Sequence, residues 1–160
     1  IEERPLLAGA AGSASFDAEG VATRNRKLVE QGVLTGYVLS TYSGRRLGLE
    51  STANAGGVRN LFLHPGGTKH DDLLSGIDRG LLVTEVMGQG VSLVTGDYSR
   101  GAAGFLIENG EISHPVEEVT IAGHLRDMYS GVVAVGEDID TRGNIHSGSI
   151  LLDEVMVAGA

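Results

Sequence analysis

Residues 104–113 read GFLIENGEIS, so an apolar run on each side meets at Asn109-Gly110. Asn-Gly between two such runs is typical of a type I′ β-turn, because both central residues of that turn take a positive φ. The pattern therefore predicts an antiparallel hairpin. Residues 28–34, LVEQGVL, match residues 106–112, LIENGEI, in register and predict a second hairpin around Gln31-Gly32. Duplication of one unit and convergence on a common turn both account for the match.

Other short segments have the β-branched, glycine-bounded composition of strands. They are residues 37–41, 60–64, 81–87, 91–95, 132–135, 149–152 and 155–158. Two segments predict helices instead: residues 69–79, with Thr68 as the cap, and a helix that starts at Thr120 and ends at Gly131. About nine strands and about two short helices indicate an α+β fold dominated by antiparallel sheet.

The length and the glycine content set the scale of the fold. With 160 residues the chain has the length of one domain, so we expect residues 1–160 to form a single domain. Its 25 glycines are well above the usual share and predict many tight turns and close backbone approaches. No apolar run approaches the roughly 18 residues of a membrane-spanning helix.

The charge and the absence of cysteine exclude several classes of function. With 12 Lys and Arg against 21 Asp and Glu, the formal net charge is −9, which disfavours nucleic acid and anionic membranes as partners. The chain has no Cys, which excludes disulfides and thiolate ligands within it and fits a cytoplasmic location.

The sequence contains no complete catalytic or metal-binding motif. His64 and His70 are separated by Pro65 and two glycines, which break helical register, so two ordinary polar histidines are favoured over a shared metal. The segment 138–149 has Asp138 and Asp140 but lacks the closing Glu of a calcium loop.

Three glycine-rich polar segments, residues 51–57, 96–101 and 143–148, are the most unusual feature. We interpret them as loops, and glycine in such loops lets another backbone approach closely, although plain turn chemistry explains them equally well. If they face a cleft, the residues available to a peptide are Asn54, Gly56, Gly57, Asp97, Tyr98, Arg100 and Gly101.

These segments, together with Gly36-Tyr37, Arg46-Leu47-Gly48 and residues 86–92 and 104–110, resemble the C-terminal region of the TldD/PmbA family. The PmbA branch, also called TldE, is the closer match. The resemblance runs from about Phe16 to the end of the chain. It implies that residues 1–160 are the C-terminal domain of a longer protein whose upstream half is absent here.

The resemblance implies a cytosolic zinc peptidase built as a heterodimer in which one branch carries the metal. There, two histidines come from an upstream helix and a cysteine from the C-terminal half. The loop from Asn144 to Ser149 corresponds to the cysteine-bearing loop, with Ser147 at or next to the place of the cysteine. Because a neutral hydroxyl is a poor zinc ligand, this departure favours the subunit without metal. His146 remains an outside candidate for a ligand.

Three hypotheses follow. In the first, the chain is a non-catalytic domain that holds no cofactor, pairs with a TldD-like, zinc-bearing subunit and supplies a wall for unfolded peptides. In the second, it belongs to a metallopeptidase that acts alone, with its metal-binding helix in the missing half. In the third, it is a peptide-binding module without proteolysis. The family's older label, modulator of DNA gyrase, finds no support in the charge balance.

Overall fold

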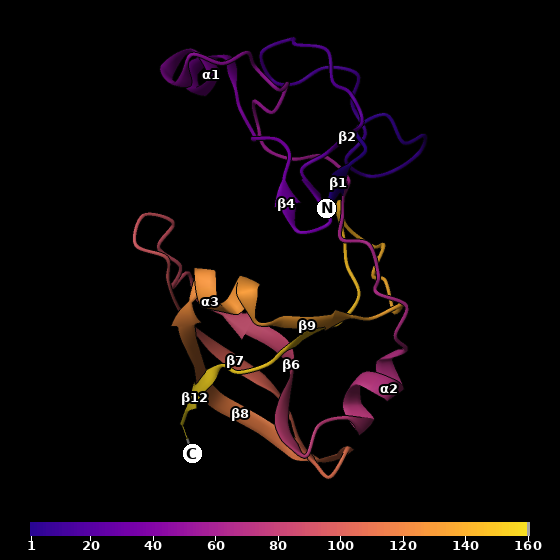
Figure 1. The fold of residues 1–160 in the computed structure, drawn as a ribbon, viewed down its shortest axis with the longest axis vertical. Helices are drawn as coiled ribbons and strands as arrows, with labels where there is room; N and C mark the ends of the chain where they lie inside the picture. Colours follow the sequence, from indigo (N-terminus) through magenta and orange to yellow (C-terminus); the bar gives the residue numbers. More distant parts are fainter. Residues whose placement is uncertain (160) are drawn as a thin grey trace. The chain divides into compact units, whose positions relative to one another are not determined.

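The structure, a computed structural model, describes residues 1–159. The chain divides into two compact units, both drawn in Figure 1. Unit 1 comprises residues 1–65 and 138–148, and unit 2 comprises residues 66–137 and 149–160, of which residue 160 lies outside the described part. That residues 1–160 form one domain therefore stays a prediction. Within residues 1–159, no helix has the length and apolar content that crossing a membrane requires.

Unit 1 is built from very short strands joined by long loops. Its four-stranded sheet has the order β10-β5-β1-β2, in which β5 pairs with β10 in parallel and the other pairs are antiparallel. A separate hairpin joins β3 to β4, and one helix, α1, completes the unit. The bounds are β1 Glu2–Glu3, β2 Arg26–Lys27, β3 Val29–Glu30, β4 Val33–Leu34, α1 Thr41–Leu47, β5 Leu61–Phe62 and β10 Ile145–His146.

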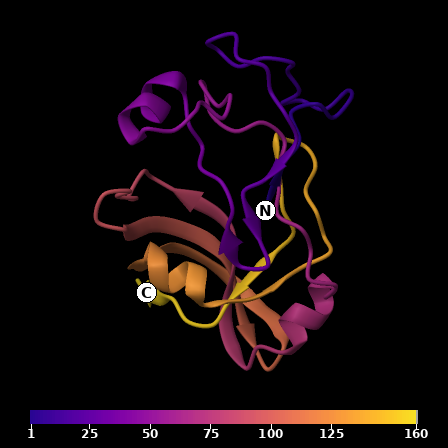
Figure 2. The same cartoon turned by 45° about the horizontal axis from the view of Figure 1, so that its top comes forward.

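Unit 2 is built around a four-stranded antiparallel sheet with the order β12-β8-β7-β6. Two further strands, β9 and β11, form an antiparallel pair, and helix α3 lies beside the end of β8 (Figure 2). The bounds are α2 His70–Ser75, β6 Arg79–Met87, β7 Asp97–Glu108, β8 Glu111–His124, α3 Leu125–Ser130, β9 Val132–Val135, β11 Ile150–Leu152 and β12 Met156–Ala158.

The core of unit 2 forms on one face of the long hairpin. Ala102, Val119 and Ile121 are buried there, and β7 and β8 place them on the same side of the sheet. Side chains from the neighbouring elements pack against this cluster, namely Leu81, Tyr98, Val116 and Val155. Burial of apolar area at roughly 25 cal/mol per Å² is what holds the sheet together.

Both predicted hairpins are confirmed. Asn109 and Gly110 have φ values of 54° and 80°, and Glu108 pairs with Glu111 across the turn. In unit 1, Gln31 and Gly32 have φ values of 49° and 78° between β3 and β4. The sheet-dominated α+β class is confirmed as well.

Residues 37–41, predicted as a strand, are not one. Thr41 instead begins α1, and Ser40 caps the helix: its hydroxyl accepts a hydrogen bond from Ser43 N at 3.2 Å. The Ser43 hydroxyl accepts in return from Ser40 N at 2.8 Å. This capping box satisfies two backbone donors at the helix start, which outweighs the strand propensity of Tyr37, Val38 and Thr41.

Residues 91–95, also predicted as a strand, form a turn. Only Val91 makes an isolated bridge, to Tyr98. The turn is fixed by a close backbone approach, since a Cβ atom on Gly90 would lie 1.7 Å from Ser99 O. Glycine is required there for this reason.

The two predicted helices are shorter than expected. The helix predicted from Thr120 begins only at Leu125, because residues 120–124 belong to β8, where Thr120 to Ala122 pair with both β7 and β12. The helix predicted at 69–79 spans His70–Ser75 and starts after Lys69 rather than after a capping Thr68. Pairing on both sides of β8 outweighs the local helical spacing.

Candidate functional site

The residues predicted to face a peptide lie in two different units. Asn54, Gly56 and Gly57 belong to unit 1, whereas Asp97, Tyr98, Arg100 and Gly101 belong to unit 2. Each group is therefore a local arrangement of its own unit. The peptide-binding role of all seven residues stays a prediction.

Asn54 is buried, with 6% of its surface exposed, and its amide is fully used inside unit 1. Its Nδ2 donates to Glu3 Oε1 at 2.7 Å, and its Oδ1 accepts from Arg26 and from the Thr52 hydroxyl. Arg26 also donates to Glu3 Oε2 at 3.0 Å, so the buried carboxylate is both paired and hydrogen-bonded. Removing one partner of such a network leaves a buried charge uncompensated. Asn54 therefore anchors the loop.

Gly56 and Gly57 form the exposed end of that loop, with φ values of 92° and 101°. The Gly57 N–H donates to Asn54 O at 2.9 Å, which closes the turn. Around Gly57, a Cβ atom would meet nothing within 4 Å, so there is space for another backbone beside it. Of the three residues predicted for peptide contact in unit 1, these two are exposed and Asn54 is not.

In unit 2 the segment predicted as a polar loop is instead the start of strand β7, so the loop interpretation of residues 97–101 is wrong. Tyr98 packs against the core cluster, and the Asp97 carboxylate accepts from the Thr95 hydroxyl at 2.6 Å. Arg100 donates to the carbonyls of Val86 and Met87 on β6. Strand pairing explains this difference, because β6 and β8 flank Gly101 on both sides.

The loop expected to match the metal-bearing loop of the family places His146 in β10. His146 is 6% exposed and its ring stacks on Phe62, with a centroid distance of 4.2 Å and an interplanar angle of 5°. Neither ring nitrogen has a hydrogen-bond partner among the described residues. Such buried unsatisfied groups are rare in folded proteins. The neighbouring Ser147 hydroxyl donates to Gly148 O at 2.9 Å.

The residues around His146 do not make a zinc site. Within residues 1–159, no three His, Asp or Glu side chains gather closely enough to hold a metal ion. Asp140 is engaged by Arg142, whose side-chain hydrogen bonds lower the pKa of the Asp140 carboxyl to about 2. A structural or catalytic zinc needs at least three protein ligands. One imidazole alone therefore does not fit the metal.

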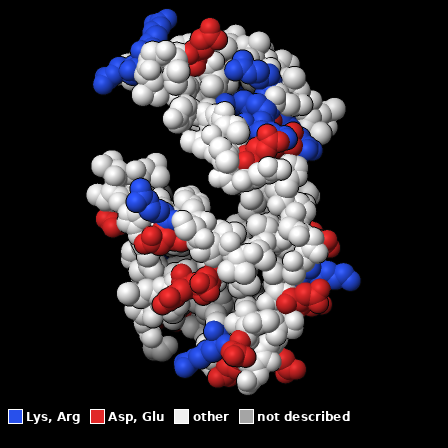
Figure 3. All heavy atoms as spheres, in the orientation of Figure 1, with Lys and Arg blue, Asp and Glu red and all other residues white. Residues whose placement is uncertain are grey.

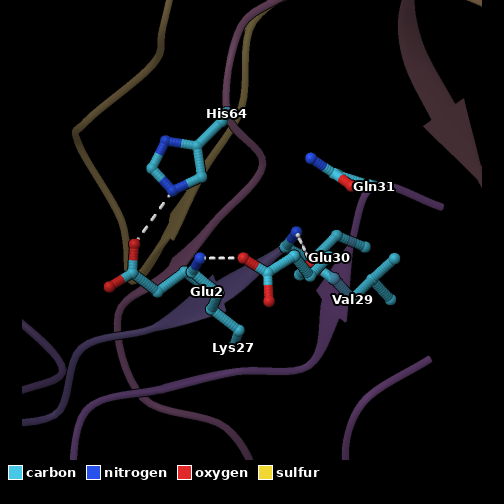
Figure 4. Close-up of a pocket in the computed structure, with 7 residues that line it drawn as sticks. Glu2, Lys27, Val29, Glu30, Gln31 and His64 are labelled. Carbon is cyan, nitrogen blue, oxygen red and sulfur yellow. Dashed lines mark hydrogen bonds and ion pairs between the residues drawn. The ribbon is translucent and has the colours of Figure 1, made fainter. Parts of the chain in front are cut away.

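Unit 1 also contains a small hollow of about 210 Å³, shown in Figure 4. Its polar side chains are paired with one another: Glu2 Oε2 with His64 Nε2 at 2.9 Å, and Lys27 with Glu30. The hydrogen bond from Arg4, together with His64, lowers the pKa of Glu2 to about 2. A carboxylate so acidic is too weak a base for proton abstraction near neutral pH. Glu2 is therefore a poor general base at this hollow.

Comparison with known proteins shows which family the chain resembles along its whole length. Residues 1–159 match the family model described as the PmbA/TldA metallopeptidase C-terminal domain. The metalloprotease PmbA of Escherichia coli O157:H7 is 53% identical over 159 residues, which are 99% of this chain and 35% of that protein. The PmbA homologue of Haemophilus influenzae is 52% identical over 160 residues, covering 99% of this chain and 36% of that protein. The chain thus spans about a third of the length of these relatives.

Solved structures agree with the sequence comparison. A candidate modulator of DNA gyrase from Bacteroides thetaiotaomicron superposes with a TM-score of 0.89 at 33% identity, over 99% of this chain and 36% of that one. TldE from Thermococcus kodakarensis superposes with a TM-score of 0.81 at 26% identity, over 99% of this chain and 39% of that one. The resemblance seen in the sequence is confirmed: the chain belongs to the PmbA/TldD metallopeptidase family and corresponds to its C-terminal domain.

Proposed function

We propose that this chain is the non-catalytic C-terminal domain of a TldE-like subunit, in a cytosolic zinc peptidase complex that processes unfolded peptides. The observation that carries the proposal is the loop at Asn144 to Ser149. It offers a serine hydroxyl already bonded to Gly148 O and a lone buried imidazole, and the described residues add no further ligand. The likeness to TldE of Thermococcus kodakarensis supports the same assignment.

Unit 2 has a surface suited to pairing with a metal-bearing, TldD-like subunit. At the tip of the loop between β6 and β7, Leu93 and Val94 are 88% and 96% exposed. Two backbone hydrogen bonds close the loop: Ser92 N donates to Asp97 O and Gly96 N donates to Ser92 O, each at 2.8 Å. Covering two large, exposed apolar side chains removes apolar area from water, which favours association. This feature supports an oligomeric functional unit.

The proposed role toward peptides is that of a wall. Gly56 and Gly57 leave backbone exposed on unit 1, and Gly101 keeps the centre of β7 free of a side chain in unit 2. An extended peptide can approach closely where no side chain projects. At Gly101 it would lie across the face of the sheet, because the backbone of β7 already pairs with β6 and β8. Gly57→Val and Gly101→Val should each lower peptide hydrolysis by the complex without preventing its assembly. Full activity in both variants would show that these glycines do not belong to the peptide-binding surface.

The direct test of the proposal is hydrolysis of an unstructured peptide by the full-length protein alone, by its metal-bearing relative alone and by the mixture. We expect cleavage to need the mixture and to stop on addition of a chelator. Cleavage by the full-length protein alone, at the rate of the mixture and sensitive to a chelator, would contradict the proposal.

A stand-alone metallopeptidase is the second candidate, and the unpartnered ring of His146 is the observation that favours it. In that case His146 would complete a ligand set with residues outside this chain. His146→Gln separates the candidates. Under our proposal the variant leaves the zinc content of the complex unchanged, whereas a stand-alone enzyme would lose zinc together with activity.

A further inference from the structure

Unit 2 contains an open groove of about 530 Å³ between α3, the end of β8 and β12. Its floor is apolar: Met128 packs over Gly123, where a Cβ atom would lie 3.4 Å from Met128 Cγ. The other apolar side chains of its lining are Tyr98 of β7, Ala122 of β8, Val155, which precedes β12, and Met156 of β12. The groove shares no lining residue with the hollow in unit 1.

One of the strands that line this groove, β12, lies at the edge of the sheet and contributes Met156 to the lining. Strand β12 pairs with β8 on one side, and on its other side it pairs with no strand of residues 1–159. Two side chains of β12 are also exposed to solvent: 70% of the surface of Met156 and 49% of that of Val157 are exposed. An edge strand with free backbone groups beside an apolar groove suits the addition of an extended polypeptide segment.

The charged side chains on the rim of the groove indicate which charge a bound segment would carry. The four carboxylates that line it are Asp97, Asp127, Asp153 and Glu154, and no Lys or Arg lines it. Arg100 is turned toward the carbonyls of β6, and His124 is held between Thr95 O and Arg126 N. Arg126 itself is exposed outside the lining. The rim is therefore an uncompensated negative surface.

The negative charge of the rim reflects the whole unit. Unit 2 holds four Lys and Arg against thirteen Asp and Glu, or −9, whereas unit 1 holds eight of each. Acidic side chains recur over the visible face of unit 2 (Figure 3). A field of one sign attracts a partner of the opposite sign and speeds its association.

We infer that this groove binds an extended, positively charged segment of another polypeptide, with apolar side chains on the floor and Lys or Arg side chains against the rim. The four carboxylates do not gather into a metal-binding group, so several separate cationic side chains match them better than one metal ion. The inference goes beyond the proposed peptidase role, because it concerns binding by this protein without its partner.

The test measures binding of a short fluorescent peptide in which Lys alternates with Val, at low ionic strength, to the full-length protein alone. We expect the Lys peptide to bind and its Glu counterpart not to bind. The triple variant Asp127→Asn, Asp153→Asn, Glu154→Gln should weaken binding of the Lys peptide by about fivefold or more, because each exposed ion pair contributes little by itself.

A matched variant, Asp71→Asn, Asp78→Asn, Glu117→Gln, removes the same charge from exposed residues of unit 2 outside the groove. We expect it to change the affinity by less than about twofold. A charge reversal, Asp127→Lys with Glu154→Lys, should instead give measurable binding of the Glu peptide. Equal weakening by both triple variants, equal binding of both peptides, or no binding of the Lys peptide would each overturn the inference.

Discussion

The carboxylate of Glu2 accepts a hydrogen bond from Arg4 at 2.7 Å, and this bond, together with His64, lowers the pKa of Glu2 from 4.5 to about 2. A carboxyl whose pKa is lowered by folding stabilises the fold above its unfolded pKa, and this contribution is lost as the pH falls through the folded pKa. We therefore expect the stability of unit 1 to fall between about pH 4.5 and about pH 2.

The measurement is amide hydrogen exchange in unit 1 as a function of pH, for the parent protein and for Glu2→Gln. The variant should show a flatter decline of protection in that interval. Asp140, whose pKa Arg142 also lowers to about 2, should keep part of the decline. Identical profiles for the parent and the variant would contradict the role of Glu2.

Asn54 shows why the sequence could not resolve the site at the level of residues. Its glycine-rich neighbourhood predicts an exposed polar loop, and the two glycines that follow it are indeed exposed. Its own partners, Glu3 and Arg26, lie 51 and 28 positions away in the sequence. No local pattern reports a hydrogen bond over such separations, so only the fold reveals that Asn54 is an anchor.

The two hairpins allow a prediction at the scale of elements. Asn109→Ala with Gly110→Ala should destabilise the protein by roughly 1 kcal/mol or more, because both residues have positive φ. A Cβ atom on Gly110 would also lie 2.8 Å from Ser75 O. Around Gly32 a Cβ atom would meet nothing within 4 Å, so Gln31→Ala with Gly32→Ala should cost less. The urea midpoints of the two double variants measure this order, and an unchanged midpoint for the first would contradict it.

Element boundaries followed from the sequence where local chemistry and pairing agree. Residues 132–135 and the Asn109-Gly110 turn are such cases. The prediction of a helix from Thr120 is wrong because that segment pairs with β7 on one side and β12 on the other. The prediction of a strand at residues 37–41 is wrong because a serine capping box starts α1 there. For the segment from Thr120, the deciding pairing lies outside the window in which hydrophobic periodicity is read. The Ser40–Ser43 capping box is a local signal, but it is polar, so hydrophobic periodicity does not register it.

At the scale of the whole molecule, the spaced glycine blocks were enough to identify the family, because several blocks in fixed order are far more specific than any one. The sequence does not predict that the net negative charge lies entirely in unit 2, because it does not show which segments form each unit. Residues 138–148 return to unit 1 after a long excursion through unit 2, so the two units interleave along the chain. The acidic groove could not be predicted either, because residues 138–148 of unit 1 separate Asp127 from Asp153 and Glu154 in the sequence.

The exposed tip of the β6–β7 loop gives a prediction about assembly. Leu93→Ser with Val94→Ser should weaken pairing of the full-length protein with its metal-bearing relative, because the partner would no longer cover apolar area at that tip. Val33→Ser with Leu34→Ser is the matched control, since those residues are 64% and 60% exposed on β4. Size-exclusion chromatography of the mixtures compares them. If the control weakens pairing while the loop variant does not, the proposed surface is wrong.

The zinc content of the full-length protein, purified alone and in complex with its metal-bearing relative, tests the central claim most directly. Because the proposal assigns the metal to the relative, we expect no stoichiometric zinc in the protein alone after dialysis. Within residues 1–159, His146 has no second ligand beside it. The complex should contain about one zinc for each pair of subunits. About one zinc for each chain in the protein purified alone, lost in His146→Gln, would contradict the account.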